Sequence, residues 1–134
     1  MNAAASVKTR LRDALAGRAD VRVAILFGSE ARGTPGTGSD VDLAIDGTAD
    51  PLELGGHLSG LLDREVNVFE LQQVTIPLLE RLVREGILVH EGVRGAGALW
   101  WSHAWTQLET DRPWYARMRD SWLARLRESG LGHG

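Results

Sequence analysis

The chain has 134 residues and a formal net charge of -3 at pH 7, which fits one domain. It contains no cysteine, so disulfides and cysteine-ligated zinc or iron–sulfur sites are excluded, and no apolar run approaches the roughly 20 residues that span a bilayer. Its mildly acidic balance argues against tight, non-specific nucleic-acid binding. We expect a cytoplasmic protein that contacts no membrane, because the first residues lack the apolar core of a signal peptide.

The first half of the chain predicts helices alternating with strands. Apolar residues at spacings of three and four predict a helix over 4–17, and the β-branched run 21–27 predicts a buried strand. Residues 28–39 are rich in glycine and break the pattern, and 41–46 alternates as a second strand. Asp50 followed by Pro51 is typical of a helix start.

The second half continues the alternation and then changes character. We expect a strand over 65–71, a helix over 75–85 with solvent-facing Arg81 and Arg84, and a short strand over 87–90. After a glycine-rich joint at 92–97 the remainder is predicted to be helical, with an interruption near Pro113. The pattern predicts an α/β (α+β) domain over 1–92 and a helical extension over 93–134.

Two short segments in the first half carry polar groups suited to phosphate and metal chemistry. Gly28 follows a buried strand, where the lack of a Cβ lets backbone N–H groups approach a ligand, and Ser29 can cap the helix start that follows. Asp40 and Asp42 lie two apart, so on a strand their side chains share a face about 6.5 to 7 Å apart. Two carboxylates on one face favour a Mg²⁺ ion between them. Taken singly, the first segment is better explained as a structural turn and the second as a solvent-facing acidic strand.

Together the segments form a longer pattern, LFGSEARG at 26–33 followed by SDVDLAI at 39–45. This pattern resembles the signature of the minimal nucleotidyltransferases in the DNA-polymerase-β-like superfamily. The resemblance implies a palm-like nucleotidyltransferase fold with a small mixed sheet of about four strands. It also implies that Gly28 and Ser29 hold the triphosphate of a nucleotide, while Asp40 and Asp42 bind Mg²⁺. Arg32 neutralises phosphate charge or supports the loop, and Glu30 is given no role.

Active members of the family carry a third carboxylate on the next core strand. The matching run here is EVNVFE at 65–70, which puts Asn67 at that position. Asparagine can still orient a ligand, but it carries no charge and cannot act as a base near neutral pH. Glu65, which shares the face of Asn67 by alternation, is one candidate to replace the carboxylate, and Glu70 is the other.

All five tryptophans lie in the last 35 residues, and Trp114, Met118 and Trp122 are spaced by four. This stripe is either cover for the domain's own sheet or a surface for a partner protein.

Stand-alone members of this size are often antitoxins whose partners are small helical HEPN-domain ribonuclease toxins. The resemblance therefore implies a Mg²⁺-dependent antitoxin that transfers AMP from ATP to a toxin tyrosine. The alternative is a non-catalytic relative that silences the toxin by binding, which the neutral Asn67 favours. A third reading is transfer to a small molecule or a nucleic-acid end.

Overall fold

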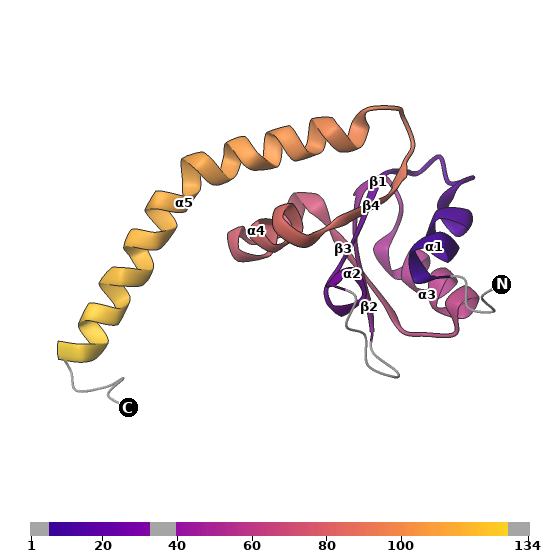
Figure 1. Cartoon of the computed structure of the whole chain (residues 1–134). Coiled ribbons are helices and arrows are strands. Elements are labelled where there is room, and N and C mark those ends of the chain that lie inside the picture. Colours follow the sequence, from indigo (N-terminus) through magenta and orange to yellow (C-terminus); the bar gives the residue numbers. More distant parts are fainter. Residues whose placement is uncertain (1–5, 33–39, 129–134) are drawn as a thin grey trace.

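The elements follow the predicted order in the computed structural model, which describes residues 6–32 and 40–128. A mixed four-stranded sheet has helices on both faces, which confirms the predicted α/β class (Figure 1). The elements are α1 (Val7–Leu15), β1 (Val21–Phe27), α2 (Ser29–Arg32), β2 (Val41–Gly47), α3 (Pro51–Leu62), β3 (Val66–Glu70), the 3₁₀ turn η1 (Leu71–Gln73), α4 (Ile76–Glu85), β4 (Ile87–Glu91) and α5 (Ala96–Glu128).

Side-chain caps define where the helices begin. The Ser6 hydroxyl accepts the backbone N–H of Thr9 at 3.2 Å, and the Asp50 carboxylate accepts that of Leu52 at 3.0 Å. Each cap satisfies an N–H group that the first helical turn leaves without a partner. Because Pro51 stands in the first turn, its missing N–H costs α3 nothing.

The sheet has the strand order β3-β2-β1-β4. β1 is antiparallel to β2 and β4, whereas β2 and β3 are parallel and are joined by the crossover helix α3. The register pairs Asp42 with Phe27 of β1 on one side and with Asn67 of β3 on the other. The end of β1 and the beginnings of β2 and β3 therefore meet at one end of the sheet.

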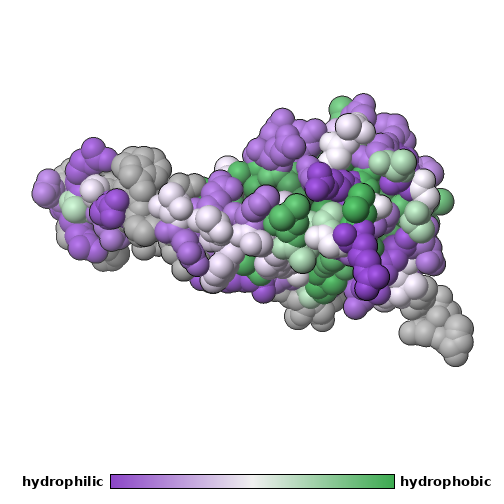
Figure 2. Space-filling model, turned by 90° about the horizontal axis from the view of Figure 1, so that it is seen from above, coloured by the Kyte–Doolittle hydropathy of each residue, from purple (hydrophilic) through white to green (hydrophobic). Residues whose placement is uncertain are grey.

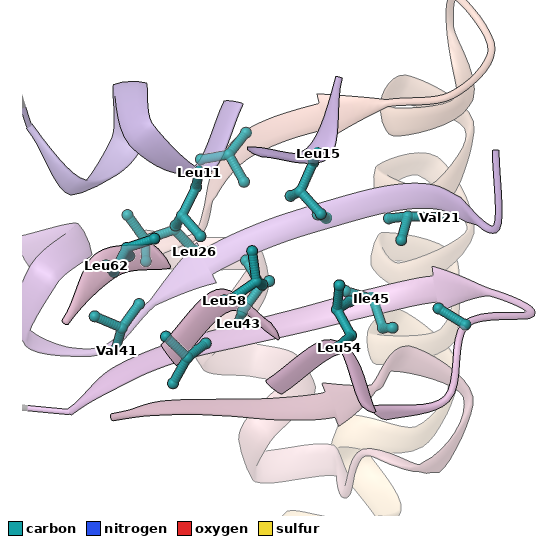
Figure 3. Close-up of a cluster of buried hydrophobic side chains, with 14 residues drawn as sticks. Leu11, Leu15, Val21, Leu26, Val41, Leu43, Ile45, Leu54, Leu58 and Leu62 are labelled. Atoms are coloured by element: carbon teal, nitrogen blue, oxygen red, sulfur yellow. The ribbon is translucent and has the colours of Figure 1, made fainter. Parts of the chain in front are cut away.

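Helices cover both faces of the central strands. On one face α1 and α3 pack leucines against the central strands (Figure 3); the residues include Leu11, Leu15, Leu54, Leu58, Leu62, Val41, Leu43 and Ile45. On the other face α4 and the beginning of α5 cover a second cluster that includes Val23, Ile25, Phe27, Ala44, Leu82 and Ala96. Asp42 alternates with Val41 and Leu43, so it belongs to this second face.

The long helix α5 differs from the prediction of an interruption near Pro113. It runs without a break from Ala96 to Glu128, and its ribbon bends along its length in Figure 1. Pro113 removes one helical hydrogen bond, but a bend in a long helix accommodates a proline. None of the described helices is both long and apolar enough to cross a membrane.

Among the described side chains of α5, those that pack on the domain lie in the first part of the helix. Ala104 and Leu108 are buried against α4, and the half-buried rings of Trp100 and Trp101 meet edge to face with centroids 5.1 Å apart. Trp105 is 47% exposed. Every described side chain from 109 to 128 is exposed, and the residues that are coloured at this end of the molecule in Figure 2 are mostly hydrophilic. The side chains of the Trp114, Met118 and Trp122 stripe lie outside the described residues.

Candidate active site

Three strands bring the predicted site residues together at one end of the sheet. Gly28 follows β1 directly, Asp40 stands just before β2, Asp42 is its second residue, and Asn67 is the second residue of β3. Asp40 is exposed, while Asp42 and Asn67 are half-buried. Since β2 and β3 run parallel, both contribute side chains from their beginnings to the same end of the sheet.

The side chain of Asn67 connects the two carboxylates. Its amide nitrogen donates to Asp40 Oδ2 at 3.2 Å and to Asp42 Oδ1 at 3.4 Å. The amide dipole presents its positive end to two negative groups that would otherwise repel each other. A neutral residue thus joins the two aspartates, and the site keeps its two negative charges.

Gly28 is required at its position for two reasons. Its φ of +80° lies in the left-handed region, which a glycine adopts without steric cost. A Cβ added there would stand 2.7 Å from Oδ2 of Asp42, closer than atoms of this kind approach. The glycine therefore both turns the chain after β1 and leaves room for the Asp42 carboxylate.

The donor set fits a magnesium ion. Asp40 and Asp42 offer carboxylate oxygens, and Asn67 adds a side-chain carbonyl oxygen if its amide turns over; Mg²⁺ is commonly held by one or two carboxylates together with phosphate oxygens. In the part of the chain that the structure describes, no three His, Cys, Asp or Glu side chains gather into a metal-holding group. Glu65 and Glu70 thus do not join the two aspartates as a third carboxylate.

The remaining predicted site residues lie on or beside α2. Ser29 opens this short helix and Arg32 closes it, so the backbone of both is placed directly after Gly28. Their side chains lie outside the described residues, as does the segment 33–39 that leads from α2 to Asp40.

Charged residues that the sequence did not assign to the site also reach it. Arg64, in the loop before β3, donates to the Glu30 carboxylate on α2, and the side chains are 23% and 10% exposed. Arg81 of α4 places its guanidinium 6.0 Å from the ring centre of Phe27, the residue before Gly28. Arg81 is exposed, as predicted, and its guanidinium also lies over the residue before Gly28. No local pattern could have indicated either contact, because the partners are 34 and 54 positions apart.

A second charged cluster lies at the opposite end of β1. Arg18 donates to Asp20 at 2.9 Å and to Glu53 of α3 at 2.8 Å. The hydrogen bond from the guanidinium lowers the pKa of Asp20, and its two carboxylate partners raise the pKa of Arg18. This cluster ties the beginning of β1 to α3.

Comparison with known folds gives close structural matches at low sequence identity. A toxin–antitoxin complex with AMP-PNP matches with a TM-score of 0.73, 20% identity, and coverage of 87% of this chain and 98% of the other. The MntA–HepT toxin–antitoxin complex matches with a TM-score of 0.66, 17% identity and coverage of 87% and 96%. The complex of a tri-AMPylated Shewanella oneidensis HEPN toxin with its MNT antitoxin matches with a TM-score of 0.64, 17% identity and coverage of 85% and 98%.

These structural similarities establish the fold of the chain.

Among curated proteins, none matches this chain. The sequence model of the family described as "Polymerase beta, Nucleotidyltransferase" matches residues 9–93, well over half of the chain. That span includes Gly28, both aspartates and Asn67. The chain therefore belongs to the polymerase-β nucleotidyltransferase family.

Proposed function

We propose that this protein is an antitoxin that transfers AMP from ATP, with Mg²⁺, to a tyrosine hydroxyl of a cognate HEPN ribonuclease toxin. The observation that carries the proposal is the meeting of Gly28, Asp40 and Asp42 at one end of the sheet in a nucleotidyltransferase fold. Its structural neighbours include an antitoxin in complex with an AMPylated HEPN toxin and a toxin–antitoxin complex with an ATP analogue, which supports this partner and this substrate.

The proposed reaction is a displacement at the α-phosphorus of ATP. The tyrosine oxygen forms a bond to that phosphorus, the bond to the bridging oxygen of the β-phosphate breaks, and pyrophosphate leaves. The tyrosine proton passes to solvent or to a phosphate oxygen, because Asn67 cannot accept it. The reaction leaves the toxin with a phosphodiester-linked AMP.

The chain's own residues have distinct tasks in this scheme. Asp40 and Asp42 would hold Mg²⁺, which neutralises phosphate charge and stabilises the attacking and leaving oxygens. Backbone N–H groups that follow Gly28, at the beginning of α2, would donate to phosphate oxygens of the nucleotide. Asn67 aligns the two aspartates by donating to both.

A second candidate function is neutralisation of the toxin by binding alone. The specific observation in its favour is the neutral Asn67 beside the two aspartates, since loss of a catalytic base commonly lowers a rate by about 10² to 10⁴. The exposed part of α5 offers such a protein a long surface for a partner.

The deciding experiment is intact-mass measurement of the cognate toxin after incubation with this protein, ATP and Mg²⁺. The toxin is expected to gain the mass of one or more adenylyl groups, and the gain is expected to vanish with the D40N/D42N variant. Toxin ribonuclease activity is measured in the same samples. An unmodified toxin that is silenced equally by the wild type and by D40N/D42N would exclude transfer and establish binding.

A further inference from the structure

The ion pair between Arg64 and Glu30 joins two parts of the chain that the nucleotide site needs. Glu30 belongs to the four-residue helix α2, which follows Gly28, and Arg64 stands in the loop between α3 and β3. Both side chains are largely buried, at 10% and 23% exposed, so water screens their attraction less than that of a surface pair.

The next residue makes a second contact on the other side of the site. The carbonyl of Glu65 accepts the backbone N–H of Val41 at 2.8 Å. Val41 lies between the two aspartates, whereas Glu30 lies two residues after Gly28. The dipeptide at 64–65 therefore contacts both the helix α2 that follows Gly28 and the strand that carries Asp42.

A helix of four residues cannot hold its orientation by its own hydrogen bonds, because one turn fixes several dihedral angles for very few bonds. The position of α2 must therefore come from tertiary contacts. Among the contacts described for α2, the ion pair between Glu30 and Arg64 is the charged one.

We propose that Arg64, through Glu30, is a positioning residue that holds α2 and the backbone N–H groups after Gly28 in the orientation that receives the phosphates of the nucleotide. This inference rests on the proposed function, because it assumes that the site binds ATP. It assigns a role to Glu30 in which its negative charge helps an anionic ligand to bind.

The two possible roles of Glu30, positioning of α2 and simple repulsion of phosphate, predict opposite changes in nucleotide affinity when its charge is removed. Removing a negative charge near a phosphate site strengthens phosphate binding if charge alone matters. Glu30→Gln releases α2 if positioning matters, and binding then weakens. Arg64→Met weakens binding under both explanations, so Glu30→Gln is the decisive variant.

The experiment measures two quantities on the full chain. Calorimetry gives the Kd of AMP-PNP with Mg²⁺, and ¹⁵N relaxation gives the order parameters of the backbone amides at 29–32. We expect Glu30→Gln and Arg64→Met to raise the Kd about 3- to 10-fold and to lower these order parameters from about 0.85 toward 0.6. Arg64→Lys keeps the charge and is expected to stay within about threefold of the wild type.

Arg18→Met is the matched control. Arg18 has a similar side-chain exposure of 21%, also bonds a carboxylate of another element, and lies at the far end of β1, about 20 Å from Gly28 by strand rise. It is expected to lower the melting temperature as much as Arg64→Met does while leaving the Kd unchanged. A Kd that rises equally in Arg18→Met would reduce the role of Arg64 to general stability and overturn the proposal.

Two further outcomes are decisive. Tighter nucleotide binding by Glu30→Gln, or unchanged order parameters in both Glu30→Gln and Arg64→Met, overturns the positioning role. A wild-type protein that binds no AMP-PNP overturns the proposed function and the nucleotide part of this inference. The order parameters then still show whether Arg64 holds α2.

Discussion

The two ends of β1 carry charged clusters of opposite design. At the beginning of the strand, one arginine bonds two carboxylates, so half of the negative charge of Asp20 and Glu53 is balanced by Arg18. At its far end, the carboxylates of Asp40 and Asp42 are bridged by a neutral amide. The first cluster contains its own cation and keeps one negative charge, whereas in the second, among the described side chains, both negative charges are left for a bound cation to neutralise.

A glycine marks each end and repeats the difference. Gly47, at the end of β2 beside Asp20, has a φ of +143°, and a Cβ there would stand 2.3 Å from a backbone oxygen. A Cβ on Gly28 would instead meet a carboxylate side chain at 2.7 Å. Gly47 therefore permits backbone packing, whereas Gly28 also gives room to a candidate metal ligand. The comparison indicates that a functional site differs from a structural ion pair in having like charges that are held close together without a cation of the chain between them.

The largest expected effect comes from removing the unbalanced charge. D40N/D42N should abolish detectable transfer, a loss of more than about 100-fold. Mutation of residues that merely hydrogen-bond to metal ligands already lowers metal affinity or activity by about 10- to 100-fold, and loss of the ligands themselves should cost more. The melting temperature should stay equal or rise, since two like charges no longer repel each other. Differential scanning calorimetry and toxin mass measurement check the two halves. A large fall in melting temperature would mean that these aspartates are structural.

Asn67→Asp adds a negative charge to the Asp40 and Asp42 cluster instead of removing charge from it. A third carboxylate supplies charge and a possible base, and we expect transfer to rise, by up to about 10²-fold. Without Mg²⁺ the variant should be less stable than the wild type, and added Mg²⁺ should raise its melting temperature more. Equal rates and equal Mg²⁺ responses in the two proteins would show that position 67 does not limit turnover.

Gly28→Ala and Gly47→Ala test the two glycines as a pair. Each forces a side chain into a left-handed conformation and a close contact, so each should lose about 1 to 3 kcal/mol of unfolding free energy. Only Gly28→Ala should also weaken binding of AMP-PNP with Mg²⁺. Urea unfolding and calorimetry measure these effects. Equal losses of nucleotide binding in the two variants would contradict the distinction.

The smallest expected effect is a pH dependence at the Arg18 end of β1. Arg18 lowers the pKa of Asp20 in the folded protein, so the resulting stabilisation is present above the ordinary Asp pKa of about 3.9 and is lost as the pH falls through the lower folded value. Arg18→Met should therefore lose less stability than the wild type between pH 5 and pH 2.5. High salt should shrink this difference because the pair is accessible to solvent.

The sequence predicted what local patterns determine. Alternating and helical spacings predict the four strands, and the motif from Leu26 to Ile45 indicates the nucleotidyltransferase fold. The sequence could not predict the Glu30–Arg64 pair. The two residues come together only because the chain crosses over through α3, and such a contact produces no periodic pattern in the sequence. Nor could it predict that α5 continues through Pro113, since the effect of one proline depends on how the surrounding helix is packed.

The parallel pairing of β2 with β3 has a consequence for folding. Gly28, Asp42 and Asn67 lie on three strands, and Asn67 reaches its place only after the chain has closed the crossover through α3. No short segment of the unfolded chain therefore reproduces the site, and a ligand that binds there binds the native state alone. Nucleotide with Mg²⁺ at a hundredfold excess over its Kd should then add about 2.7 kcal/mol to the free energy of unfolding. The shift of the unfolding transition on adding nucleotide and Mg²⁺ therefore measures occupancy of the site without any toxin.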